Sequence, residues 1–158
     1  MATEVGFALV EKLVSMLPRF ILRRVYTEAK LKDAISIETR ALNPVIFSLG
    51  SYVPDLHASF TITNFTDLVW RLHDFSAEIW IGQPLATAVC YDKPDIMRRT
   101  KTDVYTRCFL NEKQVSRLQE EKNKGNIKAT IYVWAYLESK IGLKKFSRTV
   151  ECGQITIQ

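Results

Sequence analysis

The sequence predicts an all-β protein, namely an immunoglobulin-like or fibronectin-like β-sandwich of about seven strands preceded by an amphipathic helix. Two observations favour this fold. From residue 34 onward, apolar and polar residues alternate in short runs that prolines and other turn residues separate, as expected of strands that bury one face. Before residue 34, the apolar residues recur at helical spacing instead. The predicted organisation is therefore a helical segment at residues 1–33 and a β-sandwich domain at residues 34–158.

Length and composition fit one globular domain. The chain has 158 residues, of which 47% are hydrophobic and 25% charged, so it can bury a full core and is not expected to be disordered. Its net charge of +5 would suit an anionic partner. The basic residues, however, lie in separate clusters beside acidic or turn residues, and no DNA-binding or RNA-binding signature accompanies them. A solvated basic surface is the preferred interpretation, and nucleic acid is not the expected partner.

Residues 1–33 predict one amphipathic helix that Pro18 kinks or divides. Glu11 and Lys12 interrupt its apolar run, which excludes a secretory signal and leaves too few apolar residues for a membrane span. Its expected contact face consists of Leu9, Leu13, Met16, Leu17, Phe20 and Ile21.

So broad an apolar face needs a cover, and three covers are open. They are the protein's own sheet, a protein partner or second copy of the chain, and an acidic membrane surface that the arginines of the segment would attract. With three widely spaced cysteines that fit a reducing compartment, the expected location is the cytoplasm, with peripheral membrane attachment as an alternative.

The strands follow from the alternation and from the turn residues between runs. We expect them near residues 34–40, 56–63, 75–81, 87–91, 103–110, 127–137 and 144–157. In the second of these strands, Ala58, Phe60 and Ile62 should point into the core, and Phe75, Ala77, Ile79 and Ile81 should form the buried face of the third. A helix is expected at residues 111–125, capped by Asn111.

The run at residues 127–137 carries large aromatic residues on the face that should point away from the core. These are Tyr132, Trp134 and Tyr136, and Trp80 extends the row. Large rings left in water usually mark an interface, so one hypothesis is a surface for a partner or ligand. The other is that the N-terminal helix packs across the rings. The sequence leaves both open.

The chain lacks the combinations of residues that catalysis or metal binding would need. Its two histidines and three cysteines are too widely spaced for a metal site, and no cofactor motif occurs. His73-Asp74 could pair with a serine such as Ser51 or Ser76, but adjacent residues do not place a carboxylate behind the imidazole. Asn64-Phe65-Thr66 matches a glycosylation sequon, which we interpret as chance. The expectation is a protein that is not an enzyme and uses neither metal nor cofactor.

Several segments in the β region resemble one protein family. They are FTITN followed by FSAEIWIGQPLA, then VYTRCFLNEKQVSRL, and finally VECGQITI. Across residues 34–157, this arrangement resembles the type 2 late-embryogenesis-abundant proteins and their water-stress and hypersensitive-response domains, although Asn64-Phe65-Thr66 stands where that family has Asn-Pro-Asn. The resemblance implies a single immunoglobulin-like sandwich with a non-enzymatic role in stress tolerance and contacts to membranes or other proteins. It assigns no catalytic residue.

Overall fold

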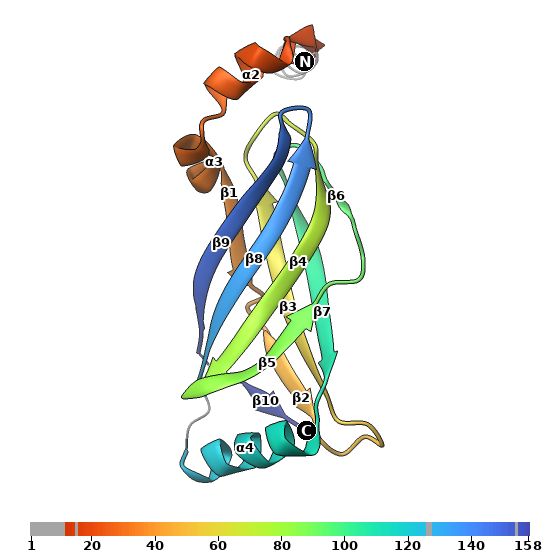
Figure 1. The fold of residues 1–158 in the computed structure, drawn as a ribbon, viewed down its shortest axis with the longest axis vertical. Coiled ribbons are helices and arrows are strands. Elements are labelled where there is room, and N and C mark those ends of the chain that lie inside the picture. Colours follow the sequence, from red (N-terminus) through yellow and green to blue (C-terminus); the bar gives the residue numbers. More distant parts are fainter. Residues whose placement is uncertain (1–11, 15, 126–127, 154) are drawn as a thin grey trace.

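The computed structural model describes residues 12–14, 16–125, 128–153 and 155–158. Helices α2 (Arg19–Val25) and α3 (Glu28–Ala34) lie at one end of an elongated, curled sheet, and helix α4 (Glu112–Asn123) lies at the other end (Figure 1). The strands are β1 (Ile35–Thr39), β2 (Val45–Ser48), β3 (Asp55–Asn64), β4 (Trp70–Ile81), β5 (Gln83–Val89), β6 (Asp95–Ile96), β7 (Thr100–Phe109), β8 (Ala129–Ser139), β9 (Gly142–Cys152) and β10 (Thr156–Ile157).

The strands form one mixed sheet with the order β10-β2-β3-β7-β5-β4-β8-β9, with β1 also paired to β3 and β6 to β4. All pairings are antiparallel among the described residues except that of β10 with β2. Strands β5 and β7 are matched at only one position, Val89 opposite Arg107. The predicted all-β class is therefore confirmed, but the sheet contains ten strands in the described part of the chain and not about seven.

The extra strands were missed for local reasons. Strands β2, β6 and β10 are short, with four, two and two residues, so each offers too little alternation to recognise. The single strand expected at residues 144–157 is in fact two strands. Strand β9 ends at Cys152, and β10 then pairs with β2 and not with β8, the partner of β9. Strand β4 begins at Trp70, before the expected start at residue 75. Its first residues were not predicted because a register shift between Leu72 and Asp74 interrupts the alternation of apolar and polar residues.

The core lies between the two halves of the curled sheet. The predicted inward residues of β3 (Ala58, Phe60 and Ile62) and of β4 (Phe75, Ala77, Ile79 and Ile81) are all buried, which confirms both faces. Strands β3 and β4 are not neighbours in the sheet, yet the rings of Phe60 and Phe75 lie 5.1 Å apart. The two halves therefore pack face to face and share one apolar core.

Helix α4 matches its prediction closely. The Asn111 side chain accepts a hydrogen bond from the Gln114 backbone N–H at 2.9 Å, and the Gln114 side chain accepts one from the Asn111 N–H at 2.9 Å. This reciprocal capping box fixes the start of the helix. Gln114 also donates to the Leu85 carbonyl at 2.9 Å, which attaches the helix to β5.

The N-terminal segment contains more breaks than the predicted single kinked helix. Helix α2 begins after Pro18 as expected, but the chain turns again at Tyr26, and Thr27 caps the separate helix α3 by accepting from the Lys30 N–H at 3.4 Å. Each helix buries one side chain in the core, Leu22 from α2 and Leu31 from α3. Leu9, part of the expected contact face, lies outside the described residues. None of the described helices is long and apolar enough to cross a membrane.

A buried polar network fastens the turn between β3 and β4. Asn64 and Thr66 are 0% and 2% exposed. The Asn64 amide donates to the carbonyls of Leu68 and Met97 at 2.8 and 2.9 Å, and its oxygen accepts from the Thr66 hydroxyl at 2.7 Å. The Thr66 hydroxyl in turn accepts from the Trp70 indole N–H at 3.0 Å. Because the Asn64 amide is buried and hydrogen-bonded, Asn64-Phe65-Thr66 forms a structural turn in the folded protein.

Replacing Thr66 by Val should therefore lower the free energy of unfolding by about 2–4 kcal/mol, because it leaves the buried Trp70 indole N–H without its acceptor and removes one of the two donors to the Asn64 oxygen, which keeps only the Thr66 backbone N–H. Thr66→Ser keeps the hydroxyl and should cost less than about 1.5 kcal/mol. Urea unfolding followed by tryptophan fluorescence measures both. Equal losses in the two variants would contradict this account, because the methyl group would then stabilise the turn as much as the hydroxyl does.

Candidate interaction surface

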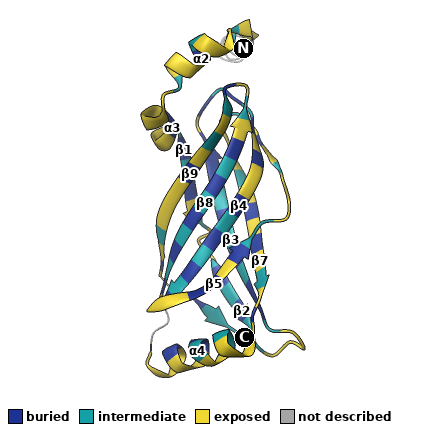
Figure 2. Cartoon of the chain, in the orientation of Figure 1, coloured by how far each residue is buried: buried dark blue, intermediate teal, exposed yellow. Residues whose placement is uncertain are grey.

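The predicted aromatic row lies on the outer face of β4 and β8. Along β8, buried residues alternate with half-buried ones, and the half-buried positions include Tyr132, Trp134 and Tyr136 (Figure 2). Trp80 on β4 meets Tyr132 edge to face, with ring centroids 5.3 Å apart. Tyr136 lies toward the other end of the strand, under the ammonium group of Lys145 at 5.7 Å. The structure thus places all four predicted surface residues on one face.

Small side chains surround Trp134. The backbone register places Ser76 of β4 on one side of it and Ser147 of β9 on the other. Between β8 and β9 a shallow, open hollow of about 230 Å³ is lined by Tyr132, Val133, Trp134, Ser147, Arg148 and Thr149. Because serine and threonine are short, the faces of the larger rings are left accessible from solvent.

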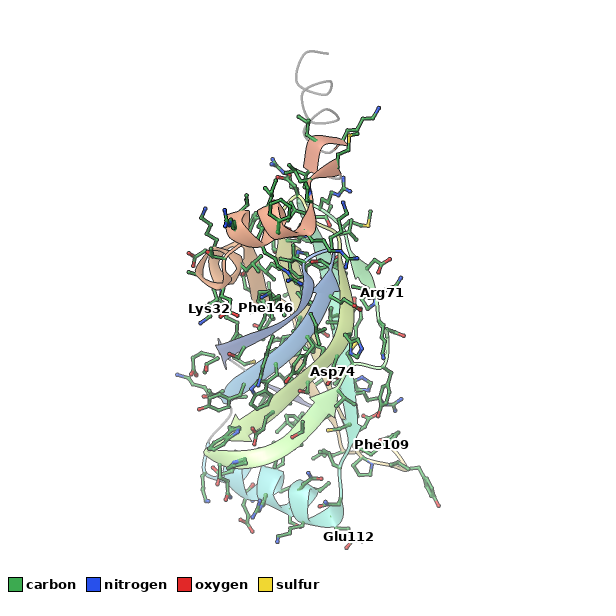
Figure 3. The ribbon with its side chains drawn as sticks, turned by 45° about the horizontal axis from the view of Figure 1, so that its top comes forward. Lys32, Arg71, Asp74, Phe109, Glu112 and Phe146 are labelled. Carbon is green, nitrogen blue, oxygen red and sulfur yellow. The ribbon has the colours of Figure 1, made fainter. Side chains whose placement is uncertain are left out.

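Carboxylates and hydroxyls border the rings. Glu78 lies opposite Tyr132, and Asp74 lies opposite Tyr136 on the outer side of β4 (Figure 3). Glu151 on β9 accepts a hydrogen bond from the Thr130 hydroxyl at 3.1 Å. The face therefore offers apolar area together with hydrogen-bonding groups of both kinds, a composition typical of surfaces that bind other molecules.

The described helical residues dock at the end of the sheet. The Arg23 guanidinium donates to the Ile141 carbonyl in the β8–β9 turn at 3.3 Å, and the Tyr26 hydroxyl accepts from the Asp67 N–H at 3.3 Å. Lys32 of α3 and Phe146 of β9 line one hollow between these two elements (Figure 3). These contacts place α2 and α3 beyond one end of the aromatic row and not across it.

Only part of the expected helix face makes contacts within the chain. Leu17 packs against the core and Ile21 is half-buried, whereas Leu13, Met16 and Phe20 are exposed at 57%, 74% and 65%. Three of the five described residues of the predicted face therefore remain open to solvent.

Sequence reasoning missed a charged cluster on the outer face of β3 and β7. The Asp55 carboxylate, which is 5% exposed, accepts from the Arg107 Nε at 3.0 Å and lies 3.2 Å from the His57 Nε2. Asp55 and His57 are two residues apart on one strand, and Arg107 is paired opposite His57. The two-residue spacing of Asp55 and His57 could have predicted that their side chains lie on the same face of a strand. Their interaction with Arg107 could not be predicted in this way, because it depends on the pairing of β3 with β7.

The electrostatics of this cluster favour an ionised carboxylate. Burial acts to raise the pKa of Asp55, but the hydrogen bond from Arg107 and the nearby His57 outweigh it, so the pKa lies below its ordinary value. One carboxylate oxygen, Oδ1, is buried without a hydrogen-bond partner among the described residues. The cluster is a fixed ion pair that ties β3 to β7.

The cysteines of the described structure are not joined by disulfides. All three cysteines are free thiols, and burial raises the pKa of Cys108 to about 11, so that thiol is protonated at neutral pH. Ser51, one serine considered for a catalytic pair with His73, instead donates to the Val53 carbonyl at 2.7 Å within a turn. Across the described residues, no group of three or more histidine, cysteine and acidic side chains gathers as a metal site.

Comparison with known proteins gives similarity at the level of structure alone. No protein-family profile and no curated protein matches the chain. A target of the Northeast Structural Genomics Consortium is 13% identical, with a TM-score of 0.48 over 78% of this chain and 88% of that one. The putative ApaA protein from Bordetella pertussis is 9% identical, with a TM-score of 0.43 over 76% of this chain and 91% of that one. A protein from Archaeoglobus fulgidus is 15% identical, with a TM-score of 0.42 over 73% and 93%. Similarities this distant assign no function.

The ion pair at Asp55 leads to a pH-dependent prediction. Asp55→Asn should lower the free energy of unfolding by about 2 kcal/mol at pH 7, because Arg107 and His57 lose their charged partner. Since the folded-state pKa of Asp55 is lowered, its stabilisation is present above the unfolded pKa and is lost as the pH falls through the folded value. The difference between the variant and the natural chain should therefore shrink in strong acid.

Urea unfolding at pH 7 and in strong acid measures this difference. Asp103→Asn is the matched control, because the Asp103 carboxylate is exposed and lies 3.9 Å from Arg40. A difference for Asp55→Asn that stays constant across this pH range would contradict the assignment of its effect to the ionised pair.

Proposed function

We propose that the chain is a non-enzymatic binding domain with a stress-protective role and that it recognises other proteins through the outer face around Trp134. The observation that carries the proposal is the open hollow between β8 and β9, where half-buried rings stand between short hydroxyl side chains. Buried aromatic anchors supply much of the binding energy of protein interfaces, and rings that stay accessible at a surface are suited to that role.

The surrounding groups fit an apolar segment of another protein. Trp80 and Tyr132 form an edge-to-face pair beside the hollow, which presents a firm apolar wall. Hydroxyl and carboxylate groups at the margin, such as Ser147 and Glu78, can accept or donate hydrogen bonds to an extended backbone. Such a surface can hold the apolar segments that other proteins expose when water loss or heat loosens them.

We also propose that the fold is an immunoglobulin-like or fibronectin-like sandwich. Two observations support this finer classification. The half formed by β5, β4, β8 and β9 joins the half formed by β7, β3, β1 and β2 through a single matched position. The Phe60–Phe75 contact crosses between these halves. The resemblance to type 2 late-embryogenesis-abundant proteins agrees with such a sandwich and with a protective role.

The test is suppression of heat-induced aggregation of a labile client enzyme such as citrate synthase, followed by light scattering. Trp134→Ser should raise the concentration needed for half-maximal protection by about fivefold or more, since removing an interface anchor costs upward of about 1 kcal/mol. Trp134→Phe keeps an aromatic ring, so its concentration for half-maximal protection should lie between those of the natural chain and of Trp134→Ser. Tyr52→Ser is the control, because Tyr52 is fully exposed on the loop before β3.

Thermal unfolding of each variant separates loss of the surface from loss of the fold. If the natural chain does not suppress aggregation, or if Trp134→Ser protects as well as Tyr52→Ser does, the proposed role of this face is wrong.

A further inference from the structure

The end of the molecule that carries α2 exposes large apolar side chains. Leu13, Met16 and Phe20 are 57%, 74% and 65% exposed, and Val25 is 46% exposed. Helix α2 lies at the extremity of the elongated fold, beyond the turn between β8 and β9, and most of it is exposed (Figures 1 and 2). The exposed residues are therefore positioned to touch a surface that the other described parts of the molecule would not obstruct.

Basic residues from distant parts of the sequence gather at this same end. A single hollow is lined by Val14 from the helical segment, residues 67–69 from the β3–β4 connection, Arg98 from the β6–β7 connection and Lys140 from the β8–β9 turn. The helical segment adds Lys12, Arg19, Arg23 and Arg24, and Arg99 follows Arg98. Clusters that are separate in the sequence therefore form one basic end.

Three of the carboxylates described near this end are paired with basic side chains. Residues 12–27 contain neither Asp nor Glu. Asp67 is engaged by Arg99 at 2.7 Å, Glu28 on α3 lies 3.9 Å from Lys144, and Asp95 is paired with Arg71 at 3.0 Å. Among the described residues, basic side chains therefore outnumber carboxylates near α2, and they lie beside exposed apolar area.

Helix α2 is also anchored to the body of the protein. Leu22 is 1% exposed, and Arg23 donates to the Ile141 carbonyl. These contacts orient the helix so that Phe20 points to solvent while Leu22 enters the core. An apolar and basic surface with a fixed orientation has the composition of segments that lie in the interface of an acidic membrane.

We propose that this end of the molecule docks on an acidic lipid surface. Phe20 and Met16 enter the boundary between headgroups and acyl chains, and Arg19 and Arg24 contact the lipid phosphates. A nucleic acid would satisfy the charge but would leave the exposed apolar side chains in water. The lipid-binding surface is separate from the hollow at Trp134, so this inference stands or fails independently of the proposed function.

The experiment is co-sedimentation of the full chain with vesicles of phosphatidylcholine alone and of phosphatidylcholine mixed with phosphatidylserine. The natural chain should sediment with the mixed vesicles and much less with the neutral ones. Binding should weaken when salt rises from about 0.1 M to about 1 M, because the screening length falls from about 10 Å to about 3 Å.

Two variants test the named side chains. Arg19→Gln with Arg24→Gln should weaken binding to mixed vesicles by about 25-fold, at about fivefold for each arginine near the surface. Phe20→Gln should weaken it by about tenfold through loss of apolar insertion. All three residues are exposed, so the thermal stability of these variants should match that of the natural chain.

The matched controls lie away from α2. Lys113→Gln with Lys122→Gln removes two exposed charges from α4, at the opposite end of the molecule, and Leu42→Gln removes an exposed apolar side chain from the β1–β2 connection. Both should bind mixed vesicles as the natural chain does. Failure of the natural chain to sediment with mixed vesicles would overturn the proposal. Equal losses in the α4 variant and the α2 variants would also overturn it, because they would indicate attraction by overall charge.

Discussion

The two halves of the sheet depend on one shared apolar core. They are joined along the sheet at a single matched position between β5 and β7, so backbone hydrogen bonds across that seam contribute little to their association. Packing across the interior, such as the contact between the rings of Phe60 and Phe75, holds them together. Because strand side chains alternate, committing one face of every strand to this core leaves the other face in contact with solvent.

The outer faces can therefore differ without disturbing the fold. On β3 and β7 the outer face carries the Asp55–Arg107 ion pair, and on β4 and β8 it carries half-buried rings. The polar network of Asn64 and Thr66 holds the connection between β3 and β4, near the point where Tyr26 attaches the helices. One well-packed interior thus supports two different surfaces and a separate helical end.

Alternation along single strands could be read from the sequence, and the pairing of strands could not. The buried residues of β3 and β4 and the outward position of Tyr132, Trp134 and Tyr136 follow from a period of two, which depends only on neighbouring residues. The capping box of α4 is equally local. The short strand β10 was hidden because it exists through its pairing with the distant β2, and the second break before α3 was hidden because the docking of Leu22 and Leu31 depends on the folded core.

The same limit applies to the surfaces. The aromatic row could be predicted because three of its four residues lie on the single strand β8, whereas the basic end could not. Arg24, Arg98 and Lys140 appeared as separate clusters beside turns, and only the folded chain brings the segments that carry them to one end. The partnership of Asp55 with Arg107 likewise requires the register of β3 with β7. Local patterns predict elements and their faces, while sites assembled from several elements require the topology.

Hydroxyl-radical footprinting of the full chain would show whether the outer face at Trp134 contacts other proteins, as we propose. The side chains would be oxidised with and without a heat-loosened client protein, and modification read by mass spectrometry. The client should protect Trp134 and Tyr132 from oxidation and leave Met16 and Phe20 on the helical end as reactive as before. Unchanged oxidation of Trp134, with protection confined to the helical end or to the face of β3 and β7, would contradict it.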